Sequence, residues 1–238
     1  VGSEMCIRDR SITANYTSDW EKWWKNPEQV RLFQFMGKDN VRFHTVIFPS
    51  CLIGTKDKWT LLHHINTAEY LQYEGGKFSK SRNIGVFGDR AKDIGVSPSV
   101  WRYYLLSTRP ESSDSQFVWH DFVTRNNSEL LKNLGNFVNR IMTFMKKYEA
   151  RLPPLPEGTL LRTDAPLPAT SDGTPWGDLV AKFVADVNAI LAKYTEYMDV
   201  GKMRAGLMTM MELSARGNLL LSDAGLDNTL FSEHRDRC

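Results

Sequence analysis

The chain has 238 residues, a formal net charge of +2 at pH 7, and a composition of 42% hydrophobic and 24% charged residues. This length leaves room for one large domain or two small ones. No uncharged apolar run approaches the length that a membrane span needs. The three cysteines, Cys6, Cys51 and Cys238, are few, odd in number and far apart. That argues against a disulfide framework and a Cys-x-x-Cys zinc site, and it favours a reducing compartment such as the cytosol.

The N-terminal third has the pattern of a mixed α/β domain. Residues 1–10, VGSEMCIRDR, look unlike the rest of the chain and are too short and too charged for a secretory signal, so we expect a non-native leader. The short apolar runs at 33–36 and 46–48 are typical of buried strands in a parallel sheet. Residues 37–44 between them are then predicted to be a strand-end loop entering a helix, where open α/β sheets bind ligands.

The C-terminal half is predicted to be helical. Beyond Asn127 one apolar stripe recurs at helical spacing and consists of Leu130, Leu134, Phe137, Val138, Ile141 and Met145. Six of the ten prolines fall within 151–177, which predicts a loop between helices. Two further helices are expected, one over roughly 178–199 and one near 202–217 that ends around Gly217.

The most informative motif is Gly75-Gly76-Lys77-Phe78-Ser79-Lys80-Ser81-Arg82, which precedes an amphipathic stretch at 100–106. Paired glycines give a backbone that can move and can approach a ligand closely. Two lysines flanked by hydroxyls suit a triphosphate, whose negative charge they can follow. By itself, a Lys-x-x-Lys pattern is far more often an exposed, charged hinge loop.

This motif resembles the Lys-Met-Ser-Lys-Ser signature loop of class I aminoacyl-tRNA synthetases, with Phe78 as the apolar residue in place of Met. The segment at 35–49, FMGKDNVRFHTVIFP, is similar to the Gly-Lys-Asp…Phe-His…Phe-Pro block of methionyl-tRNA synthetases. Further matches occur in family order through nearly all of 11–220 and look most like the eukaryotic cytosolic branch. A different class I synthetase would share the lysine loop but not Phe43-His44.

The resemblance implies a fold that is α/β and then all-α. It divides the chain into the C-terminal half of a Rossmann-like catalytic domain over 11–76, the lysine loop with a stem-contact region over 77–126, and an incomplete helical anticodon-binding domain over 127–238. It also implies site residues, position by position. The implied catalytic residues are Lys38, Lys77 and Lys80, and the implied ATP-binding residues are Gly37, Asp39, Leu71, Lys77, Ser79 and Lys80. Phe43 and His44 match the methionine pocket, and Asn136 and Arg140 match anticodon-reading positions.

Each of these residues also has a purely structural interpretation. Outside the family context, Lys38 and Asp39 would more often form a surface ion pair. A lone His44 would more often be a hydrogen-bonded structural residue. Asn136 and Arg140, four residues apart, would more often lie on the solvated face of a helix.

The activity implied by the resemblance is that of a methionine–tRNA ligase. Methionine reacts with ATP, in the presence of Mg²⁺, to form methionyl-adenylate and is then transferred to methionine tRNA. The expected location is the cytoplasm. No membrane partner is expected, and a larger synthetase complex is a possible partner. The chain has no His-x-Gly-His, since His63-His64 is followed by Ile65-Asn66, and it has no zinc-bearing insertion or other zinc site. We therefore expect this polypeptide to lack half of the active site and to be inactive alone. The alternative is a non-catalytic tRNA-binding protein derived from a synthetase.

Overall fold

The computed structural model describes residues 10–147 and 176–225, and of residues 176 and 177 it describes the backbone only. The proline-rich loop predicted over 151–177 lies almost entirely outside these ranges. Contacts within the chain define two compact units. The sheet unit is Val1–Val86 with Thr108–Phe117, and the helical unit is Phe87–Ser107 with Val118–Cys238.

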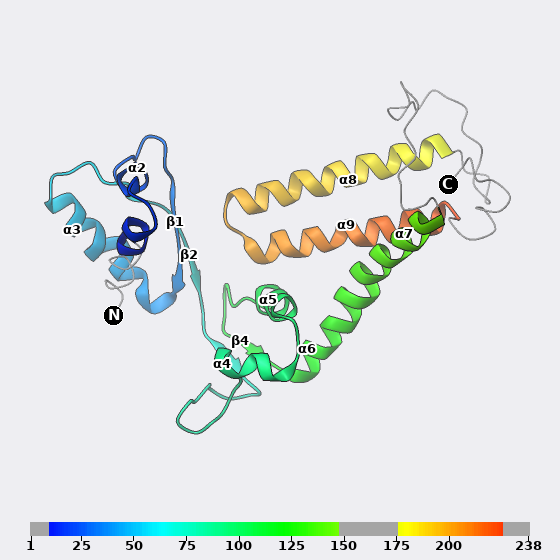
Figure 1. The fold of residues 1–238 in the computed structure, drawn as a ribbon, viewed down its shortest axis with the longest axis horizontal. Helices are drawn as coiled ribbons and strands as arrows, with labels where there is room; N and C mark the ends of the chain where they lie inside the picture. The colour runs from blue at the N-terminus through cyan, green and yellow to red at the C-terminus, as the bar shows by residue number, and fades with distance from the viewer. Residues whose placement is uncertain (1–9, 148–175, 226–238) are drawn as a thin grey trace. The chain divides into compact units, whose positions relative to one another are not determined.

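The sheet unit contains two pairs of parallel strands and short helices (Figure 1). In chain order its elements are α2 (Trp20–Trp24), β1 (Leu32–Gly37), η1 (Lys38–Asn40), η2 (Phe43–Ile47), α3 (Phe48–Gly54), β2 (Leu62–Ala68), β3 (Leu71–Tyr73) and β4 (Ser115–Phe117). β1 pairs with β2, and β3 pairs with β4. The strand predicted at 33–36 is confirmed as β1, and its parallel partner is β2.

Burial alternates along β1 as expected for a strand with one covered face. Gln34 and Met36 are buried, whereas Phe33 and Phe35 are 37% and 47% exposed. The rings of Phe33 and His64 lie 5.5 Å apart across the strand pair. This alternation determines to which face of the sheet each side chain near the carboxyl end of β1 points.

The strand predicted at 46–48 is wrong, because these residues are helical. The segment runs through the π-helical turn η2 into α3, and Val46 is 60% exposed. The buried side chains are His44, Phe48 and Leu52, which recur every fourth residue, as on one face of a helix. The contiguous apolar run thus concealed a helical period, and Pro49 lies at the start of α3, directly after the π-helical turn η2.

The core of the sheet unit joins α2 to α3. It is formed by the buried side chains of Trp24, Phe48 and Leu52, with Trp20, Leu32 and Trp59 packed around them. Thr60 is 2% exposed, and its hydroxyl donates to the carbonyl of Trp23 at 3.0 Å. Its backbone N–H donates to the carbonyl of Trp24 at 2.8 Å, so the chain entering β2 is fastened to α2.

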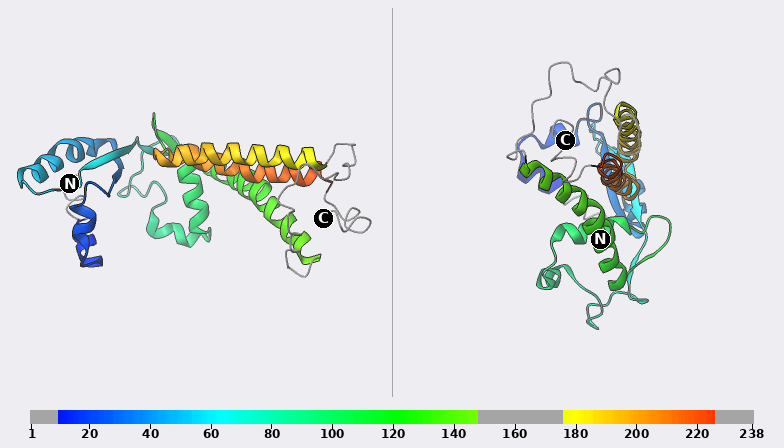
Figure 2. Two further views of the ribbon diagram at one scale, coloured as in Figure 1. Left: turned by 90° about the horizontal axis from the view of Figure 1, so that it is seen from above. Right: turned by 90° about the vertical axis from the view of Figure 1, so that its right-hand side faces the viewer.

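The helical unit is built from a long helical segment and a helix hairpin (Figures 1 and 2). Its elements are α4 (Gly88–Ala91), η3 (Lys92–Ile94), α5 (Pro98–Ser107), α6 (Trp119–Arg125), η4 (Asn126–Gly135), α7 (Asn136–Lys147), α8 (Trp176–Asp199) and α9 (Met203–Asp223). Figure 2 shows α8 and α9 packed antiparallel along their length. The helix predicted at 178–199 is confirmed as α8, and the amphipathic stretch at 100–106 lies within α5. No helix among the described residues is long and apolar enough to cross a membrane.

The predicted helix beyond Asn127 is present, but its apolar stripe is not continuous. Leu134 and Val138 are 39% and 49% exposed, whereas Leu130, Phe137 and Ile141 are partly buried. The cause is η4, a π-helical stretch of ten residues. A π-helix has more residues per turn than an α-helix, so the stripe loses its α-helical phase there.

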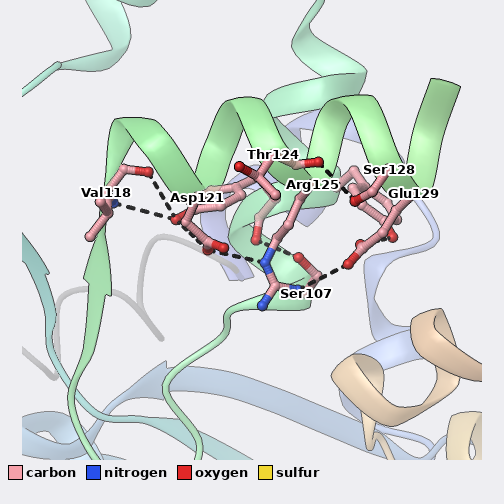
Figure 3. A network of polar contacts seen from close by, with 9 residues as sticks. Ser107, Val118, Asp121, Thr124, Arg125, Ser128 and Glu129 are labelled. Atoms are coloured by element: carbon pink, nitrogen blue, oxygen red, sulfur yellow. Dashed lines mark hydrogen bonds and ion pairs between the residues drawn. The ribbon is translucent and has the colours of Figure 1, made fainter. Parts of the chain in front are cut away.

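A polar network fastens α5 to the start of this long helix (Figure 3). Arg125 donates to Asp121 at 3.0 Å and to Glu129 at 3.4 Å, one turn away on either side. The hydroxyls of Tyr104 and Tyr103 on α5 donate to these same two carboxylates, at 3.1 Å for Tyr104 and Asp121. Burial, followed by the bond to Glu129, raises the pKa of Tyr103, so its hydroxyl remains a donor. Arg125 thereby compensates two carboxylates that lie against tyrosines of another helix.

Gly217 does not end the third helix, contrary to the prediction from the sequence. α9 continues to Asp223, and Gly217 is buried in its interior. A Cβ atom on Gly217 would lie closer than 3.0 Å to ring atoms of Phe137 on α7. The glycine therefore permits the close approach of α7 to α9, which explains a residue that otherwise weakens a helix.

Gly217→Ala is expected to destabilise the protein by about 1–2 kcal/mol, because overpacking outweighs the gain in helix propensity. Urea unfolding followed by circular dichroism measures this. Gly88→Ala is the matched control, since no atom of the residues that the structure describes lies within 4 Å of a Cβ atom at that position. Adding Phe137→Leu to Gly217→Ala should recover part of the loss. An unchanged midpoint for Gly217→Ala would show that the contact with Phe137 does not constrain the packing.

Candidate active site

Four polar residues leave the sheet at one edge. β1 ends at Gly37, β2 ends at Ala68, and these two residues are partners in the parallel register. Lys38 and Asp39 therefore follow one strand directly beside Glu69 and Tyr70, which follow the other. The carboxyl ends of neighbouring parallel strands are the usual position of ligand sites in open α/β sheets.

Lys38 is surrounded by groups that favour its charged form. Its ammonium forms an ion pair with Glu69 and lies 3.8 Å from Asp114. It also lies 4.6 Å from the centroid of the Tyr70 ring, within the range of a cation–π interaction. The hydrogen bond to Glu69 raises the pKa of Lys38 above its ordinary value.

Asp39 is joined to the same cluster through Tyr70. The Tyr70 hydroxyl donates to the Asp39 carboxylate, and this bond raises the pKa of Tyr70. The backbone N–H of Tyr70 donates to Asp114 at 3.1 Å, which lowers the pKa of Asp114, and Gln72 donates to its other oxygen at 3.1 Å. The structure thus connects two predicted site residues through a tyrosine that the sequence interpretation did not select.

The segment 108–117 completes this edge. Arg109 donates to the carbonyl of Thr67 at 3.1 Å, and the backbone N–H of Glu69 donates to the carbonyl of Pro110 at 2.8 Å. Leu71, a predicted ATP-binding residue, is partly buried and starts β3 opposite Ser115. Gly37 has ordinary extended dihedrals, and a Cβ atom there would meet no described residue within 4 Å. Nothing in the local fold therefore requires glycine at position 37.

The two predicted methionine-pocket residues occupy different environments. Phe43 is partly buried, with the Arg42 guanidinium 5.0 Å from its ring centroid. His44 is 3% exposed, and its Nδ1 lies 2.8 Å from the carbonyl oxygen of Asn40. A carbonyl only accepts, so Nδ1 carries the proton, and a neutral His44 has no N–H left for a thioether. Any contact of neutral His44 with methionine sulfur would be through the polarisable ring.

The lysine loop around residues 77–84 is closed by backbone hydrogen bonds and anchored by the ring of Phe78, and we call it the strap. The backbones of Ser79 and Ile84 exchange hydrogen bonds of 2.9 Å in both directions. The Phe78 ring packs 5.3 Å from that of Tyr73, and a Cβ atom on Gly85, whose φ is +119°, would lie closer than 3.0 Å to Phe78. The apolar residue that replaces Met in the motif thus holds the loop to its root.

The root of the loop is tied to β4. Tyr73 stacks on Phe117 with ring centroids 5.8 Å apart. The backbone N–H of Gly75 donates to the side-chain carbonyl of Gln116 at 2.7 Å, and that of Glu74 donates to the carbonyl of Phe117 at 3.0 Å. This fixed root positions a loop whose lysines, Lys77 and Lys80, face solvent.

The loop lysines, unlike Lys38, carry uncompensated charge. Lys77 and Lys80 are exposed, and neither has an ion pair within the part of the chain that the structure describes. Ser79 accepts a hydrogen bond from Arg82 at 3.2 Å, so its hydroxyl is oriented by the loop itself. Among the described residues, no hydrogen bond or ion pair joins these lysines to Lys38 or Asp39.

In the helical unit, Asn136 and Arg140 share a partner on α9. Asn136 donates to the side chain of Asn218 at 2.9 Å, and Arg140 donates to the Asn218 carbonyl at 3.2 Å. Arg140 also lies 3.4 Å from the Ser222 hydroxyl. The two residues therefore do lie on one helix face, and α9 occupies part of that face.

Sequence reasoning missed Glu69, Tyr70 and Asp114. The signal that could have found them is the strand at 62–68, whose carboxyl end places the next two residues at the ligand edge. Asp114 offers no comparable local signal, because it reaches the site through the pairing of β3 with β4, 42 or more residues apart in sequence.

The chain matches the family described as "tRNA synthetases class I (M)" over residues 5–142, more than half of its length. It therefore belongs to that family of class I synthetases. It is 59% identical over 229 residues to the probable cytoplasmic methionine–tRNA ligase of Schizosaccharomyces pombe, and 56% identical over 228 residues to the cytoplasmic methionine–tRNA ligase of Saccharomyces cerevisiae. These matches cover 96% and 95% of this chain but only 28% of each relative.

A solved structure shows the same fold. The methionyl-tRNA synthetase of Mycobacterium tuberculosis, bound by methionyl-adenylate, superposes with a TM-score of 0.62 at 21% identity. The match covers 82% of this chain and 34% of that protein. The class I synthetase fold expected from the sequence is thus confirmed at the level of the catalytic-domain architecture.

Phe78→Ser is expected to accelerate trypsin cleavage at Lys77, Lys80 and Arg82 about tenfold, because loss of the partly buried ring removes about 1.5 kcal/mol that keeps the loop closed. Phe78→Met is the matched control and should be cleaved at nearly the original rate. Limited digestion followed by mass spectrometry gives the site-specific rates. Equal rates in all three proteins would mean that the aromatic anchor does not hold the strap.

Proposed function

We propose that this chain is part of a methionine–tRNA ligase that activates methionine with ATP and transfers it to methionine tRNA. The observation that carries the proposal is the Lys38–Asp39 pair at the carboxyl edge of parallel strands, in a chain that also holds the lysine strap. Membership of the class I synthetase family supports the reaction class. The names of the relatives support methionine as the amino acid and the cytoplasm as the location.

The reaction that these residues suit is attack of the methionine carboxylate on the α-phosphorus of Mg²⁺-bound ATP, with pyrophosphate leaving. Such a displacement needs positioned substrates and cations near the developing charge, more than acid–base catalysis. Lys38 would serve from a fixed position beside the sheet. Lys77 and Lys80 would approach on the strap, where they form no ion pair with any residue that the structure describes. Asp39, Gly37, Leu71 and Ser79 complete the proposed ATP site.

We assign Phe43 and His44 to the methionine side chain. The argument rests on chemistry: an aromatic wall and a buried imidazole offer polarisable surface to a thioether. The bond from His44 to Asn40 would fix the ring orientation and thus the shape of the pocket. An orienting bond of this kind makes a pocket selective by shape, because the ring cannot turn to accommodate a polar side chain.

For the helical unit we propose a role in reading the anticodon, through Asn136 and Arg140, as part of a larger helical domain. Amide and guanidinium groups suit unstacked bases, which are read by hydrogen bonds and stacking. Residues 77–126, which include the lysine loop, are the region that we assign to stem contacts. Membership of a larger synthetase complex is compatible with this assignment.

Lys80→Ala in the full-length protein should lower the rate of methionine-dependent ATP–pyrophosphate exchange about a hundredfold, because one lost contact to developing phosphate charge costs about 3 kcal/mol. The methionine KM should change little. Lys22→Ala, which removes the same charge from an exposed site on α2, should leave both constants unchanged. Near-normal exchange by Lys80→Ala would reduce the strap to a hinge. No exchange by the unmodified full-length protein would favour a tRNA-binding protein without catalysis.

Arg140→Ala should impair charging of methionine tRNA by about 1–3 kcal/mol and leave ATP–pyrophosphate exchange nearly unchanged. The comparison is charging of methionine tRNA beside a tRNA with one anticodon base changed, with thermal unfolding of each variant. Ser222→Ala is the control, because it removes a contact of Arg140 with α9 and keeps the guanidinium. Equal losses for both tRNAs, or the same effect from Ser222→Ala, would make Arg140 a structural residue.

A further inference from the structure

One side chain, that of Tyr70, touches both Lys38 and Asp39, two residues assigned to the ATP site. Its ring lies under the Lys38 ammonium, 4.6 Å from centroid to nitrogen, and its hydroxyl donates to the Asp39 carboxylate. Lys38 and Asp39 are consecutive, so a single rigid ring spans the pair. Tyrosine has only two side-chain torsions, so it holds both groups at a small cost in conformational entropy.

Tyr70 is itself fixed from three directions. It follows β2 at the position where the parallel register ends with Gly37 and Ala68. Its backbone N–H donates to Asp114 at 3.1 Å, and its carbonyl accepts from the backbone N–H of Ser115 at 3.0 Å. The ring therefore projects from a backbone that is tied to both strand pairs of the sheet unit.

Two carboxylates face the single positive charge of the Lys38 ammonium, so the charge around Lys38 is net negative. Glu69 and Asp114 both face it, and their side chains are only 28% and 37% exposed. A triphosphate that approaches Lys38 meets two carboxylates already there. Like charges at this separation repel, so the triphosphate and Glu69 cannot both make their best contact with the same ammonium.

We propose that Tyr70 is a positioning residue of the ATP site, which holds Lys38 through its ring and Asp39 through its hydroxyl, and that ATP displaces Glu69 from Lys38. This inference rests on the proposed function, because it assigns a task to groups around that site. It adds two residues that the family motif does not contain, and it gives them opposite effects on ATP. Tyr70 strengthens ATP binding by ordering its contacts, whereas Glu69 weakens ATP binding by competing for one of them.

The contacts with Glu69 and the Tyr70 ring hold Lys38 in position when ATP is absent. An exposed lysine alone samples many rotamers, and ordering it on binding opposes affinity. With Glu69 and the Tyr70 ring in place, the ammonium is already held near the position from which it would contact the phosphates. Exchange of Glu69 for phosphate oxygens then conserves the number of ionic contacts, and the freed carboxylate returns to solvent.

The test uses ATP–pyrophosphate exchange by the full-length protein, with KM measured separately for ATP and methionine. Tyr70→Phe keeps the ring and removes the hydroxyl, so the ATP KM should rise about tenfold with the methionine KM unchanged. Tyr70→Leu removes the contact of the ring with Lys38 as well, so it should lower kcat in addition to raising the ATP KM. Glu69→Gln should lower the ATP KM about threefold to tenfold. Tyr16→Phe, on a tyrosine that is 90% exposed, is the control.

A double-mutant cycle separates positioning from general stability. If the hydroxyl acts through Asp39, Tyr70→Phe should have little further effect on the ATP KM in an Asp39→Ala background, which has no side-chain acceptor left. The full Tyr70→Phe effect in that background would overturn the proposal, as would an unchanged ATP KM. Parallel rises in both KM values with a lowered melting temperature would make Tyr70 structural, which also overturns it. An unmodified protein without exchange would refute the proposed function instead, so the two failures are distinguishable.

Discussion

The parallel register of β1 with β2 is the constraint on which the candidate site depends. It places the ends of both strands at one edge, so that Lys38 and Asp39 lie beside Glu69 and Tyr70. A slip by one residue would turn every side chain of one strand to the other face and separate these pairs. Burial of Gln34 and Met36 on one face of β1 opposes that slip. The site therefore inherits its geometry from the packing of the sheet, and its polar contacts refine that geometry.

Two means of positioning a cation occur in the same unit. Lys38 is fixed by charge, through carboxylates that compensate it where the sheet ends. Lys77 and Lys80 have no ion pair in the described ranges, and their backbone is fixed instead, by the Phe78 anchor and the closed strap. The first arrangement favours a constant position, and a ligand must displace a partner to use it. The second leaves charge available to a ligand but makes its position depend on a loop, which suits a group that moves during a reaction.

Much of this arrangement could be predicted from the sequence, and the failures have physical causes. The run at 33–36 is a strand and 178–199 a helix, because pattern and burial agree there. The run at 46–48 misled, since its apolar residues are contiguous whereas the buried ones recur every fourth residue. Gly217 misled for another reason: glycine marks helix ends, but here it admits the ring of Phe137. Tyr70 and Asp114 were out of reach, because their roles depend on strand pairing between distant segments.

The bonds of Asn136 and Arg140 to α9 bear on how a structural contact and a binding role can coexist. Arg140 has five N–H donors, and its contacts with Asn218 and Ser222 use one nitrogen, Nη1. Within the described ranges the other guanidinium donors make no hydrogen bond, so the contact with α9 does not compete with such a role. It restricts the guanidinium beforehand, which lowers the entropy lost when a ligand is bound. The same logic applies to Tyr70 and Lys38: in both units, side chains assigned to ligands are already held by the fold through part of their bonding capacity.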